Sequence, residues 1–124
     1  MRIVVAALSM MWAGAVAAQM HERLDAAALH STLIGNTITG TGRTGCIFYD
    51  YYSTDGRATS KCGDYTDTGS WRINEDGQFC LIWSKRAGTN CIELFRSGTS
   101  LGMRNPRMGG DLVPVRIEPG DVRR

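Results

Sequence analysis

From residue 33 onward, the chain consists of short runs rich in β-branched and aromatic residues, separated by Gly, Asp and Asn. Runs of this kind, bounded by turn residues, are typical of β-strands. Asp55-Gly56 and Asp76-Gly77 mark two hairpin turns, because glycine tolerates the positive φ that such turns require. The pattern predicts an all-β fold, an antiparallel meander that forms a small barrel or sandwich. Its strands are expected over 33–39, 46–52, 57–62, 70–74, 79–84, 91–96, 100–104 and 113–118.

The segment before these strands has a different periodicity. Leu24, Ala27 and Ala28 recur at helical spacing, and residues 20–30 contain neither Gly nor Pro. This spacing predicts a short helix that precedes the β-domain. The expected organisation is a helical segment over 19–32, one β-domain over 33–118 and a tail over 119–124.

Residues 1–18 have the layout of a secretory signal peptide: Arg2, an apolar run over 3–16, and small residues at the expected cleavage site. The apolar run is shorter than the ~20 residues of a typical membrane span. The first cysteine is Cys46, so no lipid-bearing cysteine follows the cleavage site. We expect cleavage near Ala18 and a mature protein in the periplasm or outside the cell, without stable membrane insertion. The predicted strands are also too short for a membrane barrel, whose strands need ~9 to 11 residues.

The charge of the chain is close to neutral. Its formal net charge is +2, of which Arg2 contributes one, so the mature chain carries +1. This balance argues against nucleic acid as a partner. The closest approach to a basic patch is formed by Arg104, Arg107 and residues 123–124, which we interpret as solvated loop and tail charges.

Four cysteines, Cys46, Cys62, Cys80 and Cys91, follow the export signal. None lies in a C-x-x-C pair, so the close spacing of a zinc ribbon or a thioredoxin-like site is missing, and no metal or cofactor is predicted. An even number of cysteines in an exported domain indicates disulfides, for which three connectivities are possible.

Local geometry favours pairing in sequence order. Cys80 and Cys91 share one face of a hairpin if they lie opposite each other. Cys46 and Cys62 share a face only if the Asp55-Gly56 turn absorbs one residue as a bulge. The face opposite Cys80 and Cys91 is the expected core, formed by Phe79, Leu81, Trp83, Ile92 and Leu94.

Several phrases occur together in a characteristic order: Leu-Ile-Gly-Asn-Thr at 33–37, Asp-Gly at 55–56, Gly-Ser-Trp-Arg-Ile at 69–73, Asp-Gly-Gln-Phe-Cys-Leu-Ile-Trp at 76–83, and Cys91. In these phrases the chain resembles a family of small secreted bacterial β-domains of unknown function that are lipocalin-like in shape. The resemblance implies a β-fold with a Cys80–Cys91 bridge and no established activity. Cys46 and Cys62 depart from the family pattern.

Residues that would carry catalysis are sparse. The two histidines, His21 and His30, both precede the β-domain and are nine residues apart, so they do not share a helix face as two metal ligands would. Asp64 and Asp67 are interpreted as solvated turn residues of a Gly-Asp-Tyr-Thr-Asp-Thr-Gly loop. Glu93 is expected on the outer face. The sequence therefore predicts a protein that is not an enzyme.

The functional hypothesis is an exported β-domain that binds a small hydrophobic ligand or a protein partner. Trp71, Trp83 and Tyr49 are the candidate ligand-lining residues, because small barrels can hold one apolar molecule. An inhibitor of an exported protease is the first alternative, with the Pro-containing segment 104–108 as its exposed loop. A hydrolase that uses Asp64 and Asp67 is the second alternative.

Overall fold

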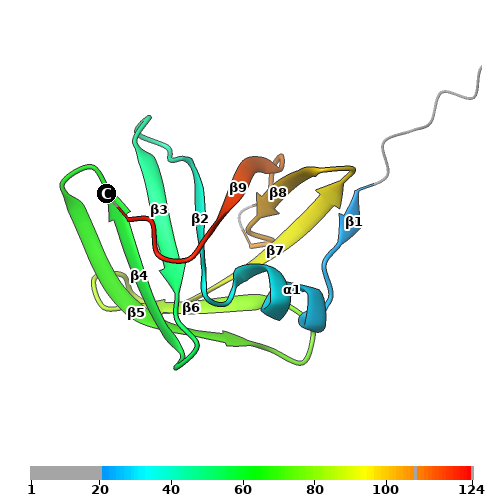
Figure 1. Cartoon of the computed structure of the whole chain (residues 1–124), viewed down its shortest axis with the longest axis horizontal. Coiled ribbons are helices and arrows are strands. Elements are labelled where there is room, and N and C mark those ends of the chain that lie inside the picture. The colour runs from blue at the N-terminus through cyan, green and yellow to red at the C-terminus, as the bar shows by residue number, and fades with distance from the viewer. Residues whose placement is uncertain (1–20, 108, 124) are drawn as a thin grey trace, which may run out of the picture.

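The computed structural model of the protein describes residues 21–107 and 109–123, which form nine strands and a single helix (Figure 1). In chain order these are β1 (Glu22–Arg23), α1 (Ala26–Leu33), β2 (Asn36–Thr41), β3 (Ile47–Tyr52), β4 (Arg57–Cys62), β5 (Tyr65–Ile73), β6 (Phe79–Trp83), β7 (Thr89–Ser97), β8 (Ser100–Arg104) and β9 (Val113–Pro119). The predicted all-β, antiparallel class is confirmed. The predicted signal peptide over 1–18 lies outside the described residues.

Strands β2 to β9 close into an antiparallel barrel of eight strands. Each strand from β2 to β8 pairs with the next strand in sequence, and β9 returns to pair with β2, with Ile38 opposite Ile117. The short β1 adds to β7, where Glu22 lies opposite Arg96. Within the described part of the chain, no helix is long and apolar enough to cross a membrane.

Helix α1 packs its buried face against the barrel core, at the end of the barrel where β2 begins. Leu29 and Leu33 are fully buried, and the Asp25 side chain caps the helix by accepting a hydrogen bond from the Ala28 amide at 2.8 Å. The helix predicted over 20–30 therefore begins and ends later, because β1 takes up the residues before the cap. Because α1 extends to Leu33, the first barrel strand begins at Asn36 rather than at residue 33.

Three hairpins share one type of connection. In the β3–β4 hairpin, the Ser53 amide donates to the Arg57 carbonyl at 2.9 Å, and Gly56 adopts a positive φ of 90°. The same arrangement joins Gly42 to Cys46 and Asn74 to Gln78. Three residues between the paired ends form the usual bulged hairpin loop. This is the extra residue that the sequence required at Asp55-Gly56.

Both disulfides follow the order of the sequence, as the hairpin geometry predicts. Cys80 and Cys91 lie directly opposite each other on β6 and β7 and are bonded. Cys46 is bonded to Cys62, which lies opposite Phe48, two residues after Cys46. Two disulfides indicate that the protein folds in an oxidising compartment.

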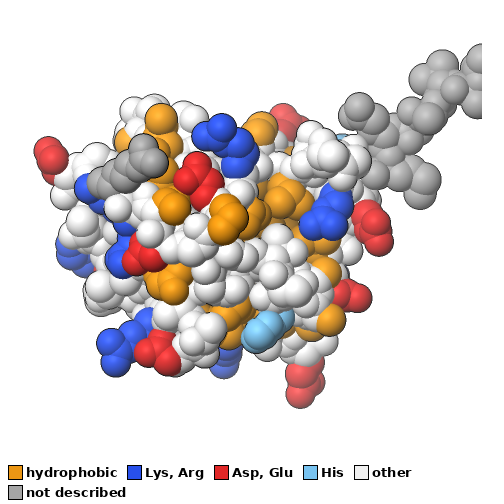
Figure 2. Space-filling view, in the orientation of Figure 1, with side chains coloured by type: hydrophobic (Ala, Val, Ile, Leu, Met, Phe, Trp, Pro, Cys, Tyr) orange, Lys and Arg blue, Asp and Glu red, His pale blue; other side chains and the backbone are white. Residues whose placement is uncertain are grey.

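Two expectations about the barrel wall are wrong. Strand β5 begins at Tyr65 rather than at residue 70, because the polar stretch Tyr65 to Gly69 pairs with β4. Arg104 is not a solvated loop charge: it lies in β8, paired with Glu93 at 3.4 Å and placed over the Phe95 ring. Figure 2 shows charged side chains of both signs spread over one face of the molecule.

Gly69 allows β5 and β6 to approach closely. A Cβ atom at this position would overlap the carbonyl oxygen of Ile82. We therefore expect Gly69→Ala to lower the free energy of unfolding by about 1 to 3 kcal/mol, the usual cost of overpacking. Urea unfolding followed by tryptophan fluorescence would measure this loss. Ser70→Ala, at the exposed neighbouring position, is the matched control and should cost less than about 0.5 kcal/mol. Equal stabilities of the two variants would contradict the expectation.

Candidate functional site

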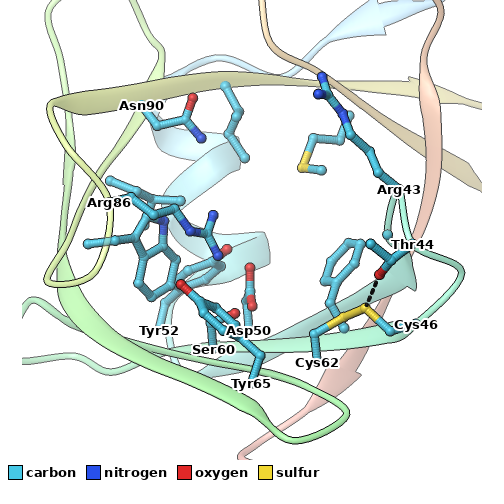
Figure 3. Close-up of a pocket in the computed structure, with 16 residues that line it drawn as sticks. Arg43, Thr44, Cys46, Asp50, Tyr52, Ser60, Cys62, Tyr65, Arg86 and Asn90 are labelled. Atoms are coloured by element: carbon cyan, nitrogen blue, oxygen red, sulfur yellow. Dashed lines mark hydrogen bonds between the residues drawn. A yellow bond between two sulfur atoms is a disulfide. The ribbon is translucent and has the colours of Figure 1, made fainter.

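The two ends of the barrel differ. At one end, α1 fills the opening and the core is packed, with the Tyr52 and Phe79 rings 4.7 Å apart. At the other end, a cavity of about 510 Å³ opens to solvent. Its rim includes residues of the β2–β3 loop, of the facing ends of β4 and β5, and of the β6–β7 connection (Figure 3).

The walls of the cavity are mainly apolar. They are formed by the inward-facing side chains of the strands, Phe48, Leu81, Trp83, Ile92 and Met103. The small residues Gly42 and Ser60 occupy two lining positions near the open end. Large side chains there would fill the barrel as they do at the closed end, so these small residues help to keep the cavity open.

Asp50 is a carboxylate on the inner face of β3, between Phe48 and Tyr52, and its side chain points into the cavity (Figure 3). Its Oδ1 atom is buried and has no hydrogen-bond partner in the described part of the protein. Burial raises the pKa of Asp50 to about 6, although the hydroxyl of Ser60 and the charge of Arg86 act in the opposite direction. A carboxyl group with this pKa can gain or lose a proton near neutral pH.

Arg86 extends from the β6–β7 connection over the cavity (Figure 3). Its guanidinium carbon lies 5.3 Å from the centroid of the Trp83 ring and 5.7 Å from that of Tyr65. Within residues 21–107 and 109–123, the guanidinium makes these ring contacts but no hydrogen bond and no close ion pair. These ring contacts restrict the position of the group and leave its N–H donors available for a ligand.

Tyr52 adds a phenol at the floor of the cavity. Burial raises its pKa well above the ordinary value, and the neighbouring charge of Asp50 raises it further. Tyr52 is therefore a neutral hydroxyl at physiological pH and does not contribute a charge to the cavity.

Asp67 anchors the β6–β7 connection that carries Arg86. It is buried in β5 and accepts hydrogen bonds from Ser84 Oγ at 2.6 Å and from the Lys85 amide at 3.2 Å. The Thr68 amide and the Tyr65 hydroxyl also donate to it. Burial alone would raise the pKa of Asp67, but these donors outweigh burial and lower it. The interpretation of Asp67 as a solvated turn residue is therefore wrong.

Asp64 and Asp67 do not form a pair of carboxylates. Asp64 is exposed in the β4–β5 turn, whereas Asp67 is 2% exposed within the strand and already has four hydrogen-bond donors. A glycosidase-type pair would need both groups to face one site across the bond to be cleaved.

The Cys46–Cys62 bridge forms part of the cavity wall near the rim (Figure 3). The Thr44 hydroxyl donates to the Cys46 sulfur at 3.4 Å. The bridge therefore ties the β2–β3 loop to the end of β4, and fixes one side of the opening.

The three residues predicted to line a ligand site have different positions. Trp83 lines the cavity. Trp71 packs on Phe79 at 5.9 Å and donates to the Ser53 carbonyl at the closed end of the barrel. Tyr49 alternates with the inward-facing Phe48 and Asp50, so its side chain faces outward. The cavity lining thus includes Trp83 but neither Trp71 nor Tyr49.

Asp50 and Arg86 were not predicted as site residues. The signal available for Asp50 was its place between Phe48 and Tyr52 on one face of a strand. Alternation alone does not assign that face to the core, because Tyr49 and Tyr51 make the opposite face equally aromatic. For Arg86 the sequence offered no signal, because a charged residue in a hairpin turn normally points to solvent.

The remaining candidates lie away from the cavity. The His30 ring contacts the edge of Trp71, at the closed end. Glu93 faces outward, as expected, and pairs with Arg23 at 2.8 Å. In the 104–108 segment, Pro106 is exposed, and residue 108 lies outside the described residues.

The described residues 21–107 and 109–123 include no group of His, Cys, Asp and Glu side chains that could hold a metal ion. What the site does offer is a mainly apolar chamber whose lining also includes one carboxyl group, two guanidinium groups, four hydroxyls and one side-chain amide. The chain matches no protein-family model, and no curated protein shows significant similarity to it.

Proposed function

We propose that this chain is an exported, non-enzymatic barrel protein of the periplasm or the extracellular space, lipocalin-like in shape, that binds a small, largely apolar ligand in its open cavity. The two disulfides support an oxidising compartment. The observation that carries the binding function is the cavity of about 510 Å³, whose size and mainly apolar lining are those of small-molecule sites.

The absence of catalysis in this proposal rests on the placement of the candidate groups. The Asp67 carboxylate already accepts hydrogen bonds from four donors, and Asp64 is exposed. The His30 ring contacts Trp71 at the closed end of the barrel. Asp50 lies in the cavity, but no second carboxylate lines the described part of the wall with it. The arrangement favours holding a ligand over transforming it.

The proposal predicts saturable binding of N-phenyl-1-naphthylamine, an uncharged apolar dye that becomes fluorescent in apolar surroundings. Met103→Trp, which fills the cavity from β8, should weaken dye binding by about tenfold or more, or ~1.4 kcal/mol. Fluorescence titration of the purified mature protein would measure both affinities.

Ile82→Trp is the matched control for this experiment. Ile82 is 48% exposed on the outer face of β6, so the same ring added there should leave dye affinity unchanged. Failure of the wild-type protein to bind the dye, or equal loss in both variants, would contradict the proposed cavity.

A further inference from the structure

The charges around the cavity favour an anionic ligand. Of the described residues that line it, three are charged: Arg43, Asp50 and Arg86. Their formal charges sum to +1 when Asp50 is ionised and +2 when it is protonated, before the further interaction that Arg43 makes is counted. Charge of one sign at a partly desolvated opening concentrates ligands of the other sign.

Arg86 supplies the geometry for a particular kind of anion. Its guanidinium is held over Trp83 and Tyr65 by ring contacts, and its N–H groups have no acceptor among the described residues. A planar guanidinium presents two parallel N–H donors, which match the two oxygens of a carboxylate. The contacts with the two rings restrict the motion of the side chain, so less side-chain entropy is lost on binding.

The apolar walls lie next to this guanidinium, in the same cavity. Phe48, Ile92 and Met103 offer a hydrocarbon surface within the barrel. A ligand that satisfies Arg86 and also covers these side chains must have both an acidic head and an apolar body.

We propose that the ligand is a carboxylate amphiphile, bound with its head group on Arg86 and its hydrocarbon part against the apolar wall of the barrel. This inference rests on the ligand-binding function proposed above and specifies the chemical class of the ligand. Asp50 limits the affinity when it is ionised, because its negative charge lies in the same cavity as the carboxylate.

Displacement of the naphthylamine dye tests the proposal with three probes of equal chain length: laurate, dodecanol and dodecyltrimethylammonium. The affinity for laurate should be at least about tenfold higher than for either other probe, because laurate alone forms charge-assisted hydrogen bonds with Arg86. All titrations are made below the micelle-forming concentrations of the probes.

Two substitutions separate Arg86 from a general charge effect. Arg86→Gln should weaken laurate binding by about tenfold more than it weakens the binding of dodecanol, with each affinity measured against the variant's own affinity for the dye. Lys85→Gln removes the same charge one residue away. The Lys85 amine donates to the Thr66 carbonyl and lies over the Tyr65 ring, outside the cavity lining, so this control should retain laurate affinity.

Asp50→Asn provides an independent readout, because it removes the competing negative charge with little change of shape. It should strengthen laurate binding at neutral pH. Equal affinities for laurate and dodecanol, an unchanged laurate affinity in Arg86→Gln, or weaker laurate binding in Asp50→Asn would overturn the inference. Continued binding of the dye in those cases would leave the proposed function standing, whereas loss of dye binding would remove both.

Discussion

Replacing both cysteines of the Cys80–Cys91 bridge with alanine should lower the free energy of unfolding by about 2 to 5 kcal/mol. The bridge joins directly opposed residues of β6 and β7, and Cys80 is 1% exposed, so the substitutions lose both a crosslink and buried contacts. Urea unfolding of the purified protein, followed by tryptophan fluorescence, would give the difference. A loss below about 1 kcal/mol would contradict the expectation.

The Cys46–Cys62 bridge should differ from the Cys80–Cys91 bridge in its effect on dye affinity. Cys46 and Cys62 line the cavity, whereas Cys80 and Cys91 alternate with lining residues and therefore lie on the outer face. Replacing Cys46 and Cys62 with alanine should therefore change dye affinity as well as stability. Loss of the Cys80–Cys91 bridge should leave the affinity of the folded protein unchanged.

Asp50→Asn should stabilise the protein at pH 7. The difference in unfolding free energy between variant and wild type should be up to about 3 kcal/mol larger at pH 7 than at low pH. The folded pKa of Asp50, about 6, lies above its ordinary value of 3.8. Between these two pH values the folded wild-type protein binds more protons than the unfolded chain, so its stability falls as the pH rises. Above about pH 6 this loss is complete.

The measurement is urea unfolding of wild type and variant at several pH values from about 3 to 8. The stability difference should grow between about pH 4 and 6 and then level off. Asp64→Asn, at the exposed position in the β4–β5 turn, is the control and should change stability by less than about 0.5 kcal/mol throughout. A difference for Asp50→Asn that is independent of pH would contradict the assignment.

Most of the barrel wall follows from local sequence rules. The Asp-Gly turns and the alternation around Cys80 and Cys91 were enough to predict hairpins, core faces and the need for an extra residue at Gly56. The phrase Gly69-x-Trp71 has a physical basis in the structure. Gly69 permits the close approach of β6, and the indole N–H of Trp71 closes a long-range hydrogen bond to the Ser53 carbonyl.

The parts that sequence reasoning missed depend on long-range hydrogen bonds. The stretch Tyr65 to Gly69 is polar and is typical of a loop, yet it forms the first part of β5. Its Asp67 side chain can be buried because it accepts hydrogen bonds from the Ser84 hydroxyl and the Lys85 amide. Those partners are 17 and 18 residues away, and no local pattern predicts them. The cavity is equally non-local, since it is the space between side chains of most of the strands.

The pairing of β9 with β2 makes closure of the barrel a non-local step in folding. All other neighbouring strands of the closed barrel are consecutive in sequence and can pair as hairpins. The pairing of β2 with β9 instead brings together distant residues, such as Ile38 and Ile117. The Thr37 hydroxyl also binds the segment that follows β9: it donates a hydrogen bond to the Gly120 carbonyl and accepts one from the Val122 amide. During synthesis, which begins at the N-terminus, the unpaired edge of β2 is therefore exposed until β9 has been made. Until this pairing of high contact order forms, the free edges of β2 and β9 are open to aggregation or to capture by a chaperone.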